Sequence, residues 1–152
     1  VKLEGGKRVV PQIKKLIESG IPVMGHLGLT PQSVHALGGF KVQGRGEDAA
    51  RILDDAKALE AAGVFALVLE LVPEDLAEQI TKELSIPVIG IGAGAKCDAQ
   101  VLVWTDLMGI TKDAPKLAKA YRNLRIEMLN AAKEYANDVS SGQFPGPEQT
   151  FH

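Results

Sequence analysis

Four charged or polar residues lie where the sequence could place them for chemistry. Lys2 and Glu4 alternate with apolar residues at the start of the chain, and His26 and Glu70 each follow an unbroken apolar run. Residues two apart in a strand point to one face, so Lys2 and Glu4 would share a face. A carboxylate against apolar walls can act as a base, and an imidazole can donate a hydrogen bond or ligate a metal. These residue types suggest acid–base chemistry.

Each of these residues also has a structural interpretation. Lys2 and Glu4 could belong to a solvated edge strand, and Glu70 could cap a helix or face water. A lone histidine at a strand end, such as His26, is more often a hydrogen-bonded structural residue. The residue types alone therefore leave both interpretations open.

The other candidate residues carry weaker patterns. The glycine-rich run at residues 90–94 follows a strand pattern but lacks the rest of a phosphate-binding fingerprint. Asp98 and Asp106 have no partner at a diagnostic spacing, so they are expected to cap helices or tie loops. His35 and His152 show no pattern that favours a role.

Alternating strand and helix patterns would position these side chains. Strand-like segments at residues 1–4, 21–27, 65–70, 86–91 and 100–104 alternate with helix-like segments at 8–19, 47–62, 74–84 and 114–138. This order predicts a parallel sheet covered by helices, either a small open sheet or about half of an eight-stranded barrel. The glycine-rich stretch 28–46 is longer than a connector needs, and the tail 140–152 is expected to lie on a surface or a neighbouring subunit.

Composition excludes several classes of protein. The chain has 152 residues, 45% of them hydrophobic and 24% charged, with a net charge of -2, which is typical of a globular domain. Its basic residues are scattered, so nucleic acid is not an expected partner. No apolar run is long enough to span a membrane, and the single cysteine, Cys97, fits a reducing compartment. We therefore expect a cytoplasmic protein, and an opening without methionine suggests that other residues precede it.

Several motifs in one order resemble the ketopantoate hydroxymethyltransferase family. They are VKLEGG at residues 1–6, GHLGLTPQS at 25–33, GFKVQGR at 39–45, LVLELVP at 67–73, IPVIGIGAG at 86–94, and the ending from FPG at 144–146 to FH at 151–152. The resemblance covers essentially the whole chain. It implies a (β/α)8 TIM-type barrel of the phosphoenolpyruvate/pyruvate-like group, with residues 1–152 as the C-terminal half of a single domain, and a homo-oligomer such as a decamer.

The resemblance also implies an activity. The family transfers a hydroxymethyl group from 5,10-methylenetetrahydrofolate to the keto acid 3-methyl-2-oxobutanoate, giving 2-dehydropantoate for pantothenate biosynthesis, with one Mg²⁺ ion that binds the keto acid. Carried over by position, Glu70 matches the proton acceptor and Glu4 a metal-binding carboxylate. Lys2 matches a ligand of the substrate carboxylate, and His26 a residue near the substrate hydroxyl.

The sequence departs from the family pattern in two ways. Two further metal carboxylates and a substrate-binding serine of the family lie upstream of Lys2, where this chain has no counterpart, and one carboxylate alone holds Mg²⁺ poorly. Leu71, Ala99 and Thr105 stand where members often carry cysteine, glycine and histidine. A catalytically silent half-barrel serving as a structural partner, and another enolate-type enzyme on this fold, are the competing hypotheses.

Overall fold

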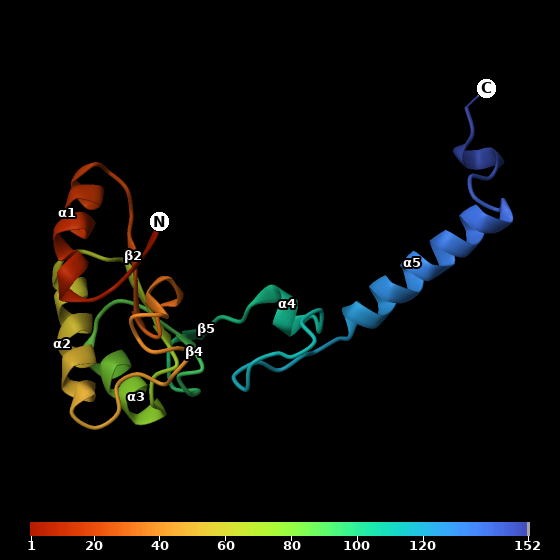
Figure 1. Cartoon of the computed structure of the whole chain (residues 1–152). Helices are drawn as coiled ribbons and strands as arrows, with labels where there is room; N and C mark the ends of the chain where they lie inside the picture. Colours follow the sequence, from red (N-terminus) through yellow and green to blue (C-terminus); the bar gives the residue numbers. More distant parts are fainter. Residues whose placement is uncertain (152) are drawn as a thin grey trace. The chain divides into compact units, whose positions relative to one another are not determined.

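A five-stranded parallel sheet organises the first two thirds of the chain (Figure 1). The computed structural model describes residues 1–151. The strands are β1 (Lys2–Glu4), β2 (Met24–Gly28), β3 (Ala66–Glu70), β4 (Val88–Ile91) and β5 (Ala99–Gln100), and they lie in the order β1-β2-β3-β4-β5. A doubly wound sheet reverses its strand order at a switch point, and this sheet does not. The uninterrupted order is that of consecutive strands in a β/α barrel.

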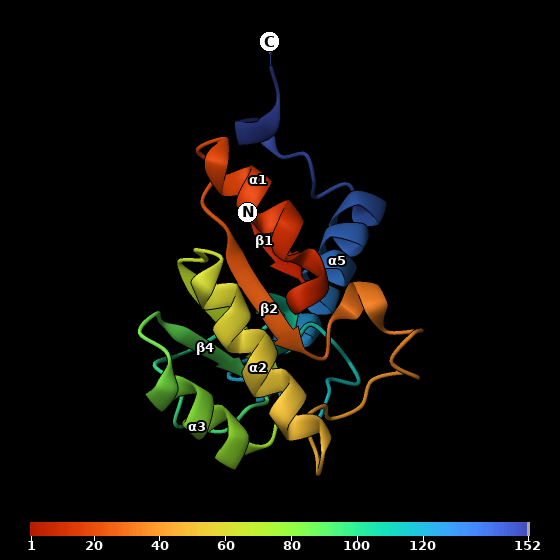
Figure 2. The same cartoon turned by 90° about the vertical axis from the view of Figure 1, so that its left-hand side faces the viewer.

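The helices that connect these strands lie on one face of the sheet, as Figure 2 shows. They are α1 (Val10–Glu18), α2 (Asp48–Ala61) and α3 (Glu74–Glu83), with short 3₁₀ turns η1 (Lys7–Val9) and η2 (Pro31–Ser33). Right-handed crossovers in a constant direction place every connecting helix on the same side. The first four strands and the three helices predicted in this part of the chain are confirmed, with ends that shift by at most three residues.

The core lies between this sheet and its helices. Alternate strand residues point toward the helices, among them Leu27, Leu67 and Leu69, and all three are buried. They pack with buried residues of the helices, including Ile13, Ile52, Ala56, Leu59 and Ile80. Complete burial of one such aliphatic side chain contributes about 1.5–3 kcal/mol, so this contact fixes which strand face meets the helices.

Two glycines and Asp98 fix the backbone at the strand entrances, and Asp98 acts as predicted. Gly20 and Gly63 follow α1 and α2 with φ of +79° and +94°, the left-handed conformation that ends a helix. Asp98 accepts a hydrogen bond from the Val88 backbone N–H at 2.8 Å and thereby ties a loop to the start of β4. Asp98 is thus a structural residue.

The last third of the chain forms a separate compact unit, residues 102–151 as described here. It contains α4 (Trp104–Leu107), α5 (Leu124–Ser141) and η3 (Pro147–Gln149). The predicted strand 100–104 was wrong beyond Gln100, because Trp104 begins α4. Within residues 1–151, no helix is both long and apolar enough to cross a membrane.

The predicted helix 114–138 was wrong over its first ten residues. The backbone N–H groups of Tyr121 and Leu124 donate to the carbonyl groups of Leu107 and Met108, at 2.8 and 3.0 Å. These bonds hold the segment before α5 against the end of α4, so its backbone does not form helical hydrogen bonds. The helix extends instead to Ser141, where Gly142 ends it with φ of +73°.

Two hydrogen bonds to a glutamate carboxylate join α2 to the segment before β4. Glu60 Oε1 accepts from both the backbone N–H and the hydroxyl of Ser85, at 2.6 and 2.7 Å. The hydrogen bond from the Ser85 hydroxyl is the main cause that lowers the pKa of Glu60 below its ordinary value of 4.5, and the bond from the Ser85 backbone N–H lowers it further. A carboxyl with a lowered pKa stabilises the fold above its unfolded-state pKa and loses that contribution as the pH falls.

We predict that Glu60→Ala lowers the free energy of unfolding by about 1 kcal/mol at pH 7, the low end for a charged hydrogen bond because Glu60 is half-exposed. The difference from wild type should shrink below about pH 4.5, where the carboxyl is protonated in the unfolded chain. Urea unfolding at several pH values measures this. Glu18→Gln, at the exposed end of α1, is the control. A difference that stays constant down to pH 3 would contradict the prediction.

Candidate active site

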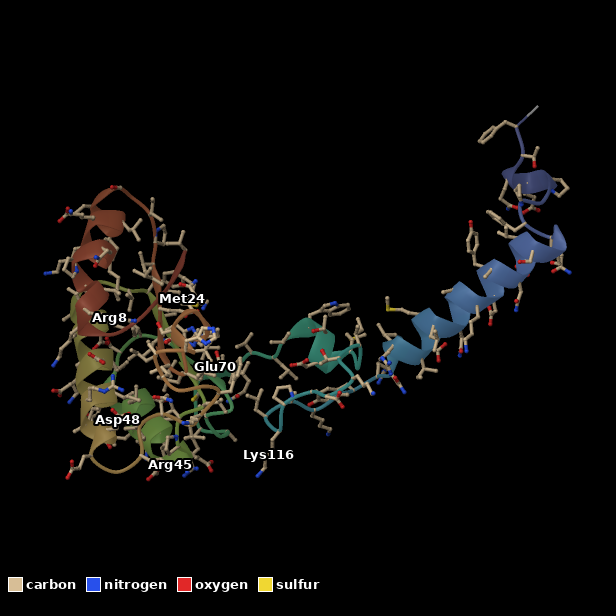
Figure 3. All side chains as sticks on the ribbon, viewed as in Figure 1. Arg8, Met24, Arg45, Asp48, Glu70 and Lys116 are labelled. Atoms are coloured by element: carbon tan, nitrogen blue, oxygen red, sulfur yellow. The ribbon has the colours of Figure 1, made fainter. Side chains whose placement is uncertain are left out.

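Strand register brings the four predicted site residues to one face of the sheet, the face that α1–α3 do not cover. Glu4 pairs with His26, and Glu70 pairs with Gly28, two residues further along β2. Because side chains alternate with a period of two, Lys2, Glu4, His26 and Glu70 all point to this face. Figure 3 shows Glu70 on the side of the sheet away from α2.

The four side chains form one connected cluster. Lys2 Nζ lies 3.2 Å from Glu4 Oε1 and 2.9 Å from His26 Nδ1. On its other side, His26 Nε2 lies 3.2 Å from Glu70 Oε2. The side chains of Glu4 and His26 are 6% and 3% exposed, whereas those of Glu70 and Lys2 are 17% and 45% exposed. The cluster thus runs from a buried centre to solvent-accessible groups at both ends.

The contacts of His26 determine which nitrogen of the ring carries the proton. The Lys2 ammonium has only donors, so its contact with Nδ1 requires Nδ1 to accept. In the neutral imidazole the proton then lies on Nε2, directed toward Glu70. Glu70 is close, but the angle does not make a hydrogen bond, so Nε2 is buried without a hydrogen-bond partner among the described residues. An unpaired buried donor costs about 1–3 kcal/mol, and a polar ligand would satisfy it.

Glu4 is held by a contact that the sequence did not reveal. The backbone N–H of Gln32, at the start of the glycine-rich loop, donates to Glu4 Oε2 at 2.9 Å. Lys2 approaches the other carboxylate oxygen. Gln32 belongs to the motif at residues 25–33, but a backbone donor leaves no signal in residue type. The loop therefore contributes to the site by its backbone.

The backbone next to Glu70 is fixed on both sides. The Glu70 carbonyl accepts from the Leu29 N–H at 2.8 Å, and the Leu71 carbonyl accepts from the Gln43 N–H at 2.9 Å. Leu71 has φ of +48°, a left-handed conformation that is unfavourable for a residue with a side chain. These hydrogen bonds stabilise the turn and hold Glu70 in place.

The described residues do not by themselves form a metal site. Within residues 1–151, no three His, Cys, Asp or Glu side chains gather closely enough to hold an ion. Mg²⁺ prefers several oxygen ligands in octahedral geometry. The buried Glu4 carboxylate fits as one such ligand, and the remaining ligands would have to come from elsewhere.

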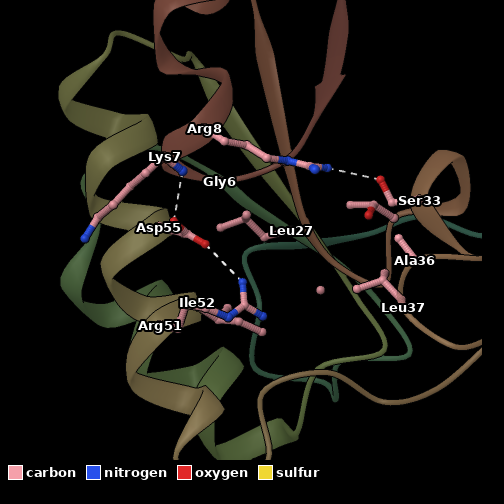
Figure 4. A pocket seen from close by; sticks show the side chains of 13 residues that line it. Gly6, Lys7, Arg8, Leu27, Ser33, Ala36, Leu37, Arg51, Ile52 and Asp55 are labelled. Carbon is pink, nitrogen blue, oxygen red and sulfur yellow. Dashed lines mark hydrogen bonds and ion pairs between the residues drawn. The ribbon is translucent and has the colours of Figure 1, made fainter.

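A cavity of about 340 Å³ lies on the other side of the β1 and β2 ends, toward the helices (Figure 4). Its lining includes Gly6, Arg8, Leu27, Arg51 and Asp55, and none of the four clustered side chains. Arg8 donates to the Ser33 hydroxyl at 3.1 Å across its mouth. This cavity, lined partly by the segments that follow β1 and β2, is therefore distinct from the cluster of strand side chains.

Comparison with known proteins identifies the family. The family model described as "Ketopantoate hydroxymethyltransferase" matches residues 1–147. The chain belongs to the ketopantoate hydroxymethyltransferase family. The fold of this family is a TIM barrel, so the five-stranded sheet is one part of a (β/α)8 barrel, as the resemblance implied.

Curated relatives of the family share more than half of their aligned residues with this chain. The proteins named 3-methyl-2-oxobutanoate hydroxymethyltransferase from Nocardioides sp. and Acidothermus cellulolyticus are 58% and 57% identical over 152 residues, or 99% of this chain. The protein of that name from Streptomyces avermitilis is 59% identical over 154 residues. The chain covers 52%, 56% and 53% of these relatives, so it spans about half their length.

The close approach of β2 and β3 at Glu70 gives a testable prediction. A Cβ atom on Gly28 would lie 2.1 Å from the Glu70 carbonyl oxygen, and Gly28 has φ of +89°. We predict that Gly28→Ala lowers the free energy of unfolding by more than the roughly 1–2 kcal/mol of a left-handed alanine, because the strand ends must also separate. Gly20→Ala is the matched control, with φ of +79° and no atom within 4 Å. If urea unfolding shows that both variants lose the same free energy of unfolding, the predicted overlap at Gly28 is refuted.

Proposed function

We propose that this chain is the C-terminal part of an enzyme that transfers a hydroxymethyl group from 5,10-methylenetetrahydrofolate to 3-methyl-2-oxobutanoate, giving 2-dehydropantoate. The observation that carries the proposal is the buried, unpaired Nε2 of His26 between two carboxylates and a lysine. A keto acid supplies the groups that this cluster lacks, namely a carboxylate for an ammonium and an oxygen acceptor for a ring N–H. The names of the relatives support the same substrate.

Glu70 is the proposed base. The keto acid carries an acidic C–H next to its carbonyl, and a carboxylate can remove this proton. Glu70 is the less buried of the cluster's two carboxylates, and the two peptide groups that follow it are held by hydrogen bonds. The deprotonated carbon forms a C–C bond with the methylene carbon of the folate, and the oxygen of a water molecule bonds to the same methylene carbon. Both C–N bonds to the folate break, and the proton taken from the C–H and one proton of the water end on the two nitrogens of the departing tetrahydrofolate.

Lys2 and His26 are the proposed substrate-binding residues. The Lys2 ammonium is half-exposed and oriented by Glu4 and His26, so it can bind the carboxylate of the keto acid. The Nε2–H of His26 can donate to a substrate oxygen, and this role requires the tautomer that Lys2 imposes. Both groups bind and orient the substrate close to Glu70, and orientation of this kind can supply several kcal/mol of the barrier reduction.

Glu4 is the proposed metal ligand from this part of the protein. When bound, Mg²⁺ would polarise the keto acid carbonyl and make its neighbouring C–H more acidic. The Gln32 N–H holds the Glu4 carboxylate in a fixed orientation without neutralising its charge. The other ligands are proposed to lie in the part of the relatives that this chain does not cover.

The proposal extends to a cytoplasmic homo-oligomer, decamer-like as the resemblance implies. Large apolar side chains of α5 are exposed in the described structure, among them Met128, Leu129, Tyr135 and Val139. Exposed apolar surface of this kind marks protein contacts in soluble proteins. It supports assembly, and the number of subunits rests on the resemblance alone.

We predict that Glu70→Gln, in the complete enzyme, lowers the rate of proton exchange at the keto acid C–H by at least about 100-fold, the scale of general-base catalysis. Binding of the keto acid should change little, because Lys2 and His26 remain. Exchange followed by proton NMR in deuterated buffer, with binding by calorimetry, measures both. Glu74→Gln, an exposed carboxylate on the following helix, is the control. Lost binding with unchanged exchange would rule out Glu70 as the base.

We predict that Glu4→Gln raises the Mg²⁺ concentration needed for half-maximal exchange by at least about tenfold, because an amide is a weaker ligand than a carboxylate. Chelation of divalent ions should abolish exchange by the wild-type enzyme, and added Mg²⁺ should restore it. Glu18→Gln should behave as wild type. An unchanged Mg²⁺ requirement in Glu4→Gln would exclude Glu4 as a ligand.

A further inference from the structure

Three charged side chains on α2 form a continuous chain of ion pairs. Arg51 Nε lies 2.6 Å from Asp48 Oδ1, and Arg51 Nη1 lies 3.3 Å from Asp55 Oδ2. These residues lie three and four positions apart, so they occupy one side of the helix. Figure 4 shows the end of this chain at Arg51 and Asp55, in the wall of the cavity.

One end of the chain holds the turn that follows Glu4. Asp55 Oδ1 accepts a hydrogen bond from the Lys7 backbone N–H at 2.9 Å, and Asp55 is 7% exposed. A Cβ atom on Gly6 would lie 2.1 Å from the Asp55 carboxyl carbon. The carboxylate is therefore packed directly against the backbone that leaves β1, two residues after Glu4.

The other end of the chain reaches the turn that follows Glu70. Asp48 Oδ2 accepts from the Gly44 backbone N–H at 2.9 Å. The preceding residue, Gln43, donates its N–H to the carbonyl of Leu71 at 2.9 Å, and Leu71 directly follows Glu70. A line of hydrogen bonds and ion pairs thus runs along α2 from the neighbourhood of Glu4 to that of Glu70.

The polar groups of this chain are engaged by the protein itself. Each carboxylate accepts from a backbone N–H and from Arg51, and the hydrogen bond from Arg51 is the main cause that lowers the pKa of Asp48. The hydrogen bond to Asp48 in turn raises the pKa of Arg51. The groups are paired with one another and with backbone N–H groups, which fits a positioning role better than capture of a ligand in the cavity.

We propose that Asp55, acting through Lys7 and connected to Asp48 by Arg51, is a positioning residue that sets the separation of Glu4 and Glu70 across His26. The expected effect on catalysis rests on the proposed function. Asp55 touches neither substrate nor base, and it acts by holding the ends of β1 and β3 at a fixed spacing. Reacting groups misplaced by about 1 Å can lose about 100-fold in rate.

The test compares three variants of the complete enzyme. Asp55→Ala should lower kcat by about 10- to 100-fold with the KM for the keto acid within about threefold of wild type. Asp55→Asn should recover only part of that loss, because its amide oxygen can still accept from Lys7 whereas its amide nitrogen cannot accept from Arg51. Asp54→Asn is the matched control, since Asp54 is 65% exposed and contacts Lys7 only through the side-chain ammonium at 3.3 Å.

A second measurement does not depend on catalysis. The ring resonances of His26, assigned by comparison with His26→Gln, should shift in Asp55→Ala and stay unchanged in Asp54→Asn. If the wild-type enzyme does not exchange the C–H proton of the keto acid, the proposed function is wrong. The His26 resonances would still decide whether Asp55 positions His26. Any one of three results would overturn the inference. They are unshifted His26 resonances in folded Asp55→Ala, a kcat of Asp55→Ala equal to that of Asp54→Asn, and no recovery of kcat in Asp55→Asn.

Discussion

The register between β1, β2 and β3 is the constraint on which the site depends. Side chains alternate along a strand, so a slip of one residue would turn His26 toward the helices and Leu27 toward the cluster. Burial of Leu27, Leu67 and Leu69 under the helices opposes such a slip. The hydrophobic core on one face therefore determines which polar residues meet on the other.

The side chains of the cluster are held by several hydrogen bonds, but one nitrogen of His26 has none. Two nearly buried groups, Glu4 and His26, are stabilised by Lys2 and by the Gln32 N–H, as buried polar groups must be. Nε2 of His26 remains without a hydrogen bond beside Glu70. A purely structural histidine would be expected to satisfy both nitrogens. The observed asymmetry argues for a ligand in this position and weakens the structural interpretation that the residue type alone left open.

Much of this arrangement could be predicted from the sequence, because it depends on local patterns. The apolar runs before His26 and Glu70 predicted strands, and the helix-like segments 47–62 and 74–84 predicted α2 and α3. The start of α5 could not be predicted, because hydrogen bonds from Tyr121 and Leu124 to α4 override a helical pattern. The role of Gln32 was also hidden, since it acts through its backbone.

The left-handed residue beside the proposed base connects these observations. Leu71 has φ of +48°, which costs about 1–3 kcal/mol in a residue with a side chain and persists only where surrounding contacts impose it. Those contacts are the N–H of Gln43 on one side and the carbonyl of Ile91 on the other. They join the long glycine-rich loop and β4 to a single peptide turn after Glu70. The long loop thus contacts the site at two places, through the N–H of Gln32 at Glu4 and through the N–H of Gln43 at Leu71, and both contacts use its backbone.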